Sequence, residues 1–252
     1  MARVVLLLVA FGVTAHAWRQ PAGDVKILCS TALRRVVEDL GPRFERASGQ
    51  RLVIQYGTST SLGRRIETGE PFDLAVLTPE LIDRLVARGA IAAGTRTSIA
   101  RAPMALAIRS GTPKPDVTTT RALTATLIAA PSIAYAREGA AGLYFTGLID
   151  RLGIAREVTQ KSVLTESGSQ VSQAVATGGA EMGVLPLSEI LGASGIDVLG
   201  TFPRDVQGYA AMVGGIGTGA ANARAAQQFI DFLMSPDATP VIERAGMERP
   251  RG

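Results

Sequence analysis

The chain has 252 residues and a formal net charge of +4 at pH 7. Its positive charges are spread along the sequence without basic runs or interleaved aromatic residues, so nucleic-acid binding is not predicted. A single cysteine, Cys29, excludes an intramolecular disulfide and argues against a structural zinc site.

The first 17 residues have the pattern of a secretion signal. A short positive leader that contains Arg3 precedes an apolar run over 4–15, which is too short to span a bilayer. Ala15-His16-Ala17 then supplies a small-x-small cleavage pattern. Residues 1–17 are therefore predicted to be a signal peptide, and the mature chain to be a soluble periplasmic protein.

Cleavage at this point would remove the only histidine of the chain, His16. The mature chain then lacks the usual general base at neutral pH, the Ser-His-Asp arrangement and the commonest metal ligand. We therefore predict a protein that is not an enzyme and that holds neither a metal nor a cofactor. A histidine-free enzyme with Cys29 as its nucleophile stays open as an alternative, beside a structural role for a buried thiol.

Short apolar runs alternate with amphipathic segments in the first third of the chain, as in α/β proteins with mainly parallel strands. The apolar runs predict strands over 25–28, 52–56 and 74–77. Apolar residues at helical spacing predict a helix after each strand, over 33–44, 62–69 and 79–89.

An extended stretch over 102–108 leads into a turn-rich segment and a second series of strands and helices. In that series we expect strands over 133–135 and 183–185 and helices over 141–152 and 169–177, with a turn over 188–191. A second extended stretch over 209–213 precedes two C-terminal helices over 223–234 and 238–245.

The two extended stretches predict that the chain passes from one lobe into another and back again. On this interpretation residues 24–103 and 207–252 form lobe 1, and residues 104–206 form lobe 2. The fold class is α/β with two lobes, each a mostly parallel sheet flanked by helices, joined by a two-strand hinge. Such an arrangement places a cleft between the lobes.

The segment Tyr56 to Thr78 contains the most informative pattern of the chain. A predicted strand runs into Gly57-Thr58-Ser59-Thr60-Ser61, and a predicted helix begins on those hydroxyl residues. The first backbone N–H groups of a helix have no partners within the helix, so they form a binding site for anions. Arg64 and Arg65 are expected on the exposed face of this helix, or at the rim of the cleft.

Three further turns have similar chemistry. Ligands of open α/β sheets bind at the carboxyl ends of the strands, where the helix N-termini converge. The turns predicted at that edge consist of small or hydroxyl-bearing residues, which let a ligand approach the backbone closely. The three further turns are Ser30-Thr31-Ala32, Ala140-Ala141-Gly142 and Gly168-Ser169, and with Ser59-Thr60 they make four.

These motifs resemble the molybdate-binding family of periplasmic solute-binding proteins, which have type II lobes and serve ABC importers. The resemblance covers nearly the whole mature chain. It is carried by the segments Ser59-Thr60-Ser61-Leu62, Ile66-Glu67 with Gly69, Pro71 and Asp73, Ala141-Gly142-Leu143-Tyr144, 229–234 and 245–247. It implies a type II periplasmic binding protein fold, an importer permease as partner and a monomeric state.

The resemblance also assigns ligand-binding positions one by one. The second ligand-binding serine of the family falls on Ser59, its alanine amide on Ala141, and its valine amide at about Gly168. Ala32 and Pro186 stand where the family has a serine and a tyrosine, so two side-chain donors are missing. Ser30 or Thr31 can replace the first hydroxyl from a shifted position.

These departures point to a ligand other than molybdate. Arg137 lies just ahead of Ala141, where a guanidinium could bind a carboxylate in bidentate fashion. The alternative for Arg137 is an ordinary solvated loop residue. The predicted ligand is accordingly a small anion, either a molybdate-like oxyanion or a small organic carboxylate.

The predicted function is therefore capture of a small anion by closure of the two lobes, followed by delivery to an ABC importer. The same fold could instead serve as a periplasmic ligand sensor for a signalling receptor. Nothing in the sequence separates these two roles. Asp73 and Glu67 are expected to be structural, because no partner carboxylate is evident for either of them.

Overall fold

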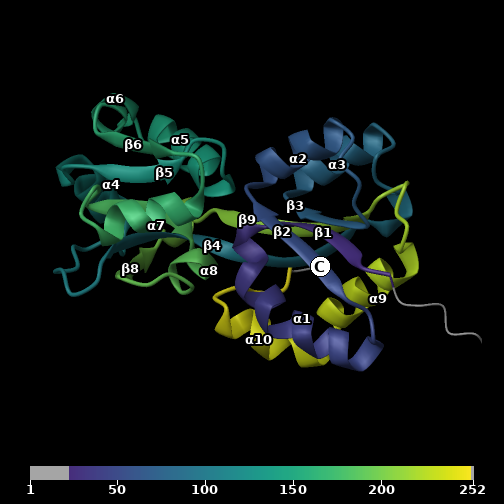
Figure 1. The fold of residues 1–252 in the computed structure, drawn as a ribbon. Helices are drawn as coiled ribbons and strands as arrows, with labels where there is room; N and C mark the ends of the chain where they lie inside the picture. Colours follow the sequence, from purple (N-terminus) through teal and green to yellow (C-terminus); the bar gives the residue numbers. More distant parts are fainter. Residues whose placement is uncertain (1–22, 251–252) are drawn as a thin grey trace, which may run out of the picture.

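The computed structural model describes residues 23–250, so the signal peptide predicted over 1–17 lies outside the described residues. The molecule has two lobes of α/β structure, and two strands run from one lobe to the other (Figure 1). The sheet order along the molecule is β2-β1-β3-β9-β4-β7-β5-β6, with β8 paired to β4.

The first lobe is built on β1 (Val25–Ser30), β2 (Leu52–Gly57) and β3 (Leu74–Leu77). β1 pairs in parallel with both β2 and β3. Helices α2 (Ser59–Glu67) and α3 (Pro79–Ala87) cover one face of this sheet. The other face is covered by the helices α1 (Arg34–Ser48), α9 (Ala223–Met234) and α10 (Thr239–Arg244) (Figure 1).

The second lobe contains β5 (Ile133–Ala136), β6 (Ser162–Thr165), β7 (Met182–Pro186) and β8 (Ile196–Thr201). β5 pairs in parallel with β6 and β7. The helices of this lobe are α4 (Thr120–Ala129), α5 (Ala140–Arg151), α6 (Ala155–Thr159), α7 (Gly168–Ala176) and α8 (Leu187–Ile190). Short 3-10 turns complete the chain: η1 (Thr31–Leu33), η2 (Ala93–Thr95), η3 (Arg204–Val206) and η4 (Pro236–Ala238).

The long strands β4 (Thr97–Arg109) and β9 (Tyr209–Ile216) connect the lobes. β4 pairs antiparallel with β9 up to Pro103 and with β7 from Met104 onward. We propose lobe boundaries at 103/104 and 206/207, of which the first coincides with this change of partner and the second lies shortly before β9. Because both crossing strands are antiparallel to their neighbours, the sheet is mixed, and parallel pairing is confined to the outer strands.

Three hydrophobic clusters hold this architecture together. The largest runs through both lobes and joins the face under α1, α9 and α10 to the face under α4, α5 and α6. A second lies beneath α2 and α3, and a third beneath α7 and α8. β1 contributes Ile27 and Cys29 to the first cluster and Leu28 to the second, since successive side chains point to opposite faces. Strands covered on both faces carry continuous apolar runs, which made them recognisable in the sequence.

Four elements were not predicted. β6 and β8 lie at the edges of the second lobe, and their residues are mostly half-buried, so they lack a continuous apolar run. The helix α4 has a weakly amphipathic sequence, and α6 has only five residues. Elements of this kind acquire their structure from neighbouring elements rather than from local periodicity.

Candidate ligand-binding site

A cavity of about 30 Å³ lies between the two lobes, at the carboxyl ends of the central strands. This is space for about two water-sized groups. Seven of the predicted site residues line it: Ser30, Thr31, Ala32, Ser59, Ala141, Gly168 and Pro186. They come from the ends of β1 and β7 and from the beginnings of η1, α2, α5 and α7, so segments far apart in the sequence meet here.

Ser59 is the first residue of α2 and is only 5% exposed. The helix begins there because Thr58 caps it, its Oγ1 accepting a 3.2 Å hydrogen bond from the Ser61 N–H. The Ser59 Oγ itself is a buried atom that has no hydrogen-bond partner within the described structure. Buried hydroxyls are normally satisfied, so this atom is a donor available to a ligand.

Two more helices contribute their first residues to the cavity. α5 supplies Ala140 and Ala141, and α7 supplies Gly168. Ser167 caps α7, because its Oγ accepts a hydrogen bond of 3.3 Å from the Gln170 N–H. Three helix N-termini with partial positive charge therefore border one small space, which favours a negatively charged ligand.

Gly142 does not line the cavity but lets α5 begin beside β5. A Cβ atom at this position would lie 1.8 Å from the carbonyl oxygen of Ala136. Only glycine permits so close an approach of helix and strand. Gly142 was predicted to let a ligand approach the backbone closely. In this structure it instead lets the α5 backbone approach the β5 backbone closely.

Glu189 is a cavity residue that sequence analysis missed. Its Oε1 accepts a 2.9 Å hydrogen bond from the Thr31 Oγ1, so the contact joins α8 of one lobe to η1 of the other. Burial raises the pKa of the Glu189 carboxyl to about 7, against the opposing effects of the Thr31 bond and the positive charge of Arg34. The only sequence signal was an acidic residue shortly after Pro186, at the carboxyl end of a buried strand.

The identity of Gly168 is explained by the same carboxyl group. A Cβ atom on Gly168 would lie 1.7 Å from the Glu189 Oε2, so a larger residue would collide with it. Beside it, the Ser188 Oγ donates a 2.7 Å hydrogen bond to the carbonyl oxygen of Ala32. The Ser188 bond holds α8 close to the opposite lobe, whereas the Gly168 contact packs α8 against α7 within its own lobe.

The cavity shares lining residues with two larger pockets. A pocket of about 440 Å³ shares Thr31, Gly168 and Glu189 with it and adds Arg34 and Arg35. We call this the arginine pocket. Another, of about 420 Å³, shares Ser59 and Ala140 and includes two tyrosines, Tyr144 and Tyr209. We call this the tyrosine pocket. Both have the volume of small-molecule sites.

The remaining predicted site residues lie around the cavity rather than in it. Ser169 lines the arginine pocket, and its Oγ lies 3.0 Å from the Ser167 Oγ. Thr60 lines the tyrosine pocket, and its Oγ1 donates a 2.9 Å hydrogen bond to the Glu138 carbonyl oxygen. Arg137 is exposed and lines neither the cavity nor these two pockets.

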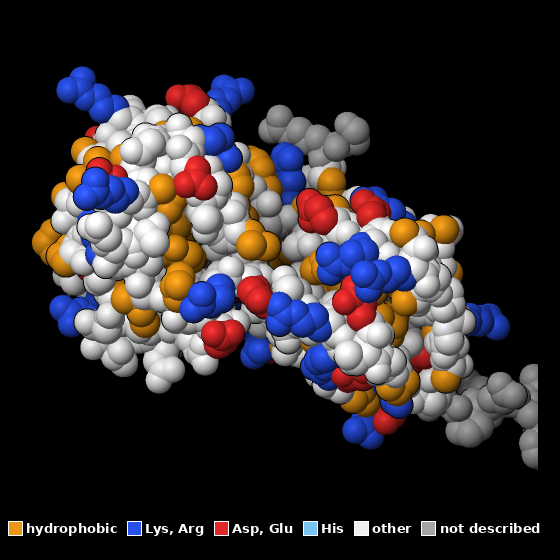
Figure 2. All heavy atoms as spheres, turned by 90° about the horizontal axis from the view of Figure 1, so that it is seen from above, with side chains coloured by type: hydrophobic (Ala, Val, Ile, Leu, Met, Phe, Trp, Pro, Cys, Tyr) orange, Lys and Arg blue, Asp and Glu red, His pale blue; other side chains and the backbone are white. Residues whose placement is uncertain are grey.

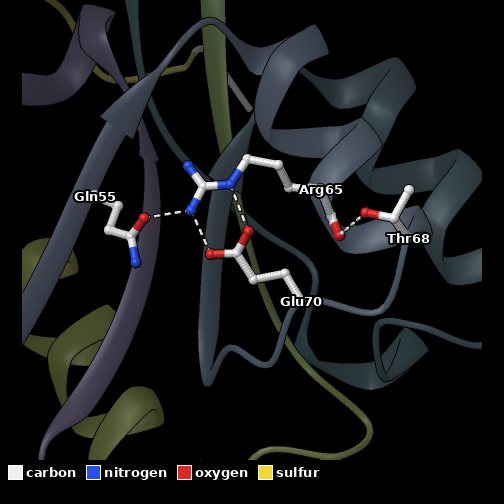
Figure 3. Close-up of polar contacts among 4 residues, drawn as sticks. All are labelled: Gln55, Arg65, Thr68 and Glu70. Carbon is white, nitrogen blue, oxygen red and sulfur yellow. Dashed lines mark hydrogen bonds and ion pairs between the residues drawn. The ribbon is translucent and has the colours of Figure 1, made fainter.

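Further polar contacts close the cleft at its rim. Arg64 of α2 pairs with Glu138 of the opposite lobe, and the Arg35 guanidinium donates to the Leu191 carbonyl oxygen. Arg65, the next residue of α2, instead pairs within its own lobe with Glu70 and Gln55 (Figure 3). Of the two arginines, Arg64 therefore lies at the cleft rim. On the face seen in Figure 2, acidic and basic side chains are interspersed.

Cys29 is fully buried at the end of β1. Burial raises the pKa of its thiol to about 12, so the group stays protonated at neutral pH. A protonated buried thiol is a poor nucleophile, so burial favours the structural role for Cys29. Within residues 23–250, there is no group of three or more His, Cys, Asp or Glu side chains that could hold a metal ion. Helices in that range are too short or too polar to cross a membrane.

A cavity bordered by helix N-termini, lying between two α/β lobes that are joined by two crossing strands, is characteristic of the type II periplasmic binding proteins. Comparison with known families agrees with this class. Residues 25–248 match the sequence model described as "Bacterial extracellular solute-binding protein", and the chain belongs to this family.

The chain is also similar to individual proteins of known function or structure. The aconitate isomerase of a Pseudomonas species is 28% identical over 235 residues, covering 91% of this chain and 89% of that protein. The molybdate-binding protein ModA of Azotobacter vinelandii is 26% identical over 252 residues, covering 95% and 96%. The solved structure of the Azotobacter vinelandii periplasmic molybdate-binding protein has a TM-score of 0.77 at 22% identity, covering 90% of this chain and 100% of that one. The predicted resemblance and fold class are confirmed.

Proposed function

We propose that this protein captures a small organic carboxylate in the cavity between its lobes and delivers it to an ABC importer. The observation that carries the proposal is the buried Ser59 hydroxyl, which has no hydrogen-bond partner among residues 23–250 and lies at the N-terminus of α2. A carboxylate oxygen placed there would satisfy this donor and would meet the partial positive charge of three helix ends. The periplasmic location follows from the family.

A carboxylate suits this cavity better than a tetrahedral oxyanion. Oxyanions of the molybdate type are held by donors on every side, whereas Ala32 and Pro186 offer no side-chain donor and Glu189 adds a carboxyl group. The cavity has space for a group of two oxygen atoms, and the body of an organic acid would extend into the arginine pocket. We expect Arg34, whose guanidinium lies 4.3 Å from the centre of the Tyr56 ring, to bind a second carboxylate there.

Thermal unfolding with a panel of anions tests this proposal: molybdate, tungstate, sulfate, phosphate, succinate and trans-aconitate. A ligand present at about 100 times its Kd stabilises the folded state by about 2.7 kcal/mol. For a chain of this size, such stabilisation raises the Tm by about 5–10 °C. We expect succinate or trans-aconitate to produce the shift. A shift with molybdate and tungstate alone would overturn the carboxylate assignment, and a shift with none would overturn anion binding.

Two arginine variants locate the second carboxylate. Arg34→Gln is expected to lose about 10- to 100-fold in affinity for succinate or trans-aconitate, because it removes one charge-assisted contact. Arg137→Gln is the matched control and is expected to keep the wild-type affinity, since Arg137 lines neither the cavity nor the two pockets. The reverse result would move the second contact from Arg34 to Arg137.

An isomerase acting on an unsaturated organic acid is a second candidate function. It is favoured by the Pseudomonas relative named aconitate isomerase and by the carboxyl of Glu189 in the cavity. In an allylic proton shift, a base removes a proton from one carbon, the double bond moves, and the proton is returned to the other carbon. Burial brings the pKa of Glu189 to about 7, which suits both proton removal and proton return.

Proton NMR of trans-aconitate in D2O with the purified protein tests this second candidate. The isomerase predicts a new set of signals and deuterium incorporation, both abolished by Glu189→Gln. If trans-aconitate raises the Tm but its spectrum stays unchanged, the protein is a binding protein without this activity. A role as a sensor is distinguished from transport by asking whether a permease and an ATPase are encoded beside the gene.

A further inference from the structure

Glu189 is an acidic residue inside a cavity that otherwise favours negative charge. Its Oε1 is engaged by Thr31, and its Oε2 lies against Gly168 at the mouth of the arginine pocket. It belongs to α8, which follows directly on β7, so the main chain fixes its position at the strand end. The carboxyl is therefore held in the cavity by the Thr31 hydrogen bond and by its place at the strand end, and the missing side chain of Gly168 leaves room for it.

An ionised carboxylate and a bound anion would repel each other strongly in so small a space, because the low dielectric of a buried site screens charges poorly. A protonated carboxyl has the opposite effect. It carries one O–H donor and can give a charge-assisted hydrogen bond to the anion, which is stronger than a bond between neutral groups. The bound state is therefore compatible with a neutral Glu189 and unfavourable for an ionised one.

The cations near Glu189 are already engaged in the proposed complex, because Arg34 is assigned to a second carboxylate of the ligand and Arg35 donates to the Leu191 carbonyl oxygen. Arg34, Arg35 and Glu38 of α1 line the arginine pocket beside it, and they include both signs of charge. From α7 it is faced by uncharged side chains, Ser169, Ser172 and Gln173. At the end of β1, Cys29 is buried, and its thiol stays protonated.

We propose that the anion enters the cavity together with one proton, which is held on Glu189, so that ligand capture is coupled to proton uptake. This inference rests on the proposed function and makes Glu189 a specificity-determining residue of the same site. Atoms and charge balance without a co-reactant, because the proton comes from solvent and returns to solvent on release. Mildly acidic conditions favour capture, and alkaline conditions favour release.

The direction of the pH dependence follows from the unliganded state. Burial holds the pKa of Glu189 at about 7 without ligand, and a bound anion raises it further. At pH 6 the carboxyl is neutral in both states, so binding takes up almost no proton. Above pH 7 the free protein is ionised and must take up a proton on binding, so affinity falls by up to tenfold per pH unit.

Isothermal titration calorimetry with succinate or trans-aconitate, in buffers of different ionisation enthalpy, measures the proton uptake directly. We expect wild-type protein to take up close to one proton at pH 8.5 and almost none at pH 6. Glu189→Gln keeps the shape of the side chain and is expected to bind with the same affinity at both pH values and without proton uptake. Glu157→Gln, which changes an exposed carboxyl group of α6 outside the cavity and both adjoining pockets, is the matched control and is expected to behave as wild type.

The outcomes separate this inference from the proposed function. Anion binding without proton uptake at pH 8.5 would overturn the coupling and leave anion capture intact. Absence of binding by the whole panel at pH 6 would overturn both. If the Glu189→Gln protein does not fold, the wild-type pH series decides alone, and an affinity independent of pH between 6 and 8.5 would contradict the coupling.

Discussion

Ser59 shows how a single side chain can indicate a ligand. Its hydroxyl is buried and has no partner in the part of the chain that the structure describes, although the backbone around it is regular and the preceding Thr58 is satisfied as a helix cap. Leaving a buried polar group unpaired costs about 1–3 kcal/mol, so an arrangement of this kind is unfavourable until something binds. A ligand that accepts a hydrogen bond from Ser59 would therefore remove this free-energy cost.

Ser59→Ala separates the binding role of the hydroxyl from a structural role. We expect affinity for the carboxylate to fall about 10- to 100-fold, because a hydrogen bond to a charged group contributes about 1.5–3 kcal/mol. The free energy of unfolding without ligand should stay the same or rise, since no existing bond is lost. Calorimetric titration and urea unfolding measure the two quantities.

Ser61→Ala is the control for this prediction. Ser61 lies on the same helix but is exposed, so its removal is expected to change neither quantity. A loss of unfolding free energy in Ser59→Ala without a loss of affinity would show that the Ser59 hydroxyl is structural.

Glu189 and Arg34 illustrate the limit of sequence reasoning at single positions. Arg137 seemed suited to a carboxylate because it precedes Ala141 by four positions, yet it is exposed and lies outside the cavity and both pockets. Arg34 and Glu189 follow no motif in the chain. Adjacency in sequence is a poor guide here, because the cavity is formed by segments from both lobes.

The sequence was sufficient to predict the helices whose N-termini border the cavity. Hydroxyl and glycine residues precede α2 and α7, and apolar residues recur at helical spacing within them. Capping is a local interaction, so Thr58 and Ser167 can cap their helices whatever the rest of the fold does. The predicted helix starts accordingly lie within a few residues of the observed ones.

The junction of β5 with α5 depends on one glycine. In Gly142→Ala the new methyl group would lie 1.8 Å from the carbonyl oxygen of Ala136, and a backbone atom cannot move aside as a side chain can. We expect a loss of about 1–3 kcal/mol in the free energy of unfolding, as in other overpacked positions. Urea denaturation followed by circular dichroism measures it.

Gly147→Ala in the same helix is the matched control. A Cβ atom there would lie 3.5 Å from its nearest neighbour, Arg151 Nη1, which is ordinary contact. Alanine is the better helix former, so this change is expected to raise the free energy of unfolding by up to about 1 kcal/mol. Equal effects of the two substitutions would contradict the steric explanation for Gly142.

Across the whole molecule, one hydrophobic cluster runs through both lobes, and polar contacts join the lobes around the cavity. Of these, the Arg64–Glu138 pair is largely exposed, and pairs of that kind contribute about 0–1 kcal/mol. The unpaired Ser59 hydroxyl opposes closure as long as the cavity is empty. A ligand that pairs with this hydroxyl removes the cost and therefore favours closure.

We accordingly expect the protein to open when it has no ligand. The lobes touch across the cavity in this structure, and we call the radius of gyration calculated from it the closed value. Small-angle X-ray scattering should give a larger radius of gyration without ligand, and adding succinate or trans-aconitate should reduce it to the closed value. Arg64→Gln, which removes one contact at the cleft rim, should leave the liganded value unchanged. A radius of gyration equal to the closed value without ligand would contradict this expectation.

Local chemistry in the sequence determined the α/β class, the two lobes and the small turns at the strand ends. Apolar periodicity, helix caps and turn residues act over a few positions, so they can be recognised without knowing the fold. Only the tertiary structure decided which side chains share the cavity. Thr31 and Glu189 are 158 positions apart, and they meet because β4 and β9 carry the chain into the second lobe and back. A contact of that range depends on the packing of the whole molecule, which no local pattern encodes.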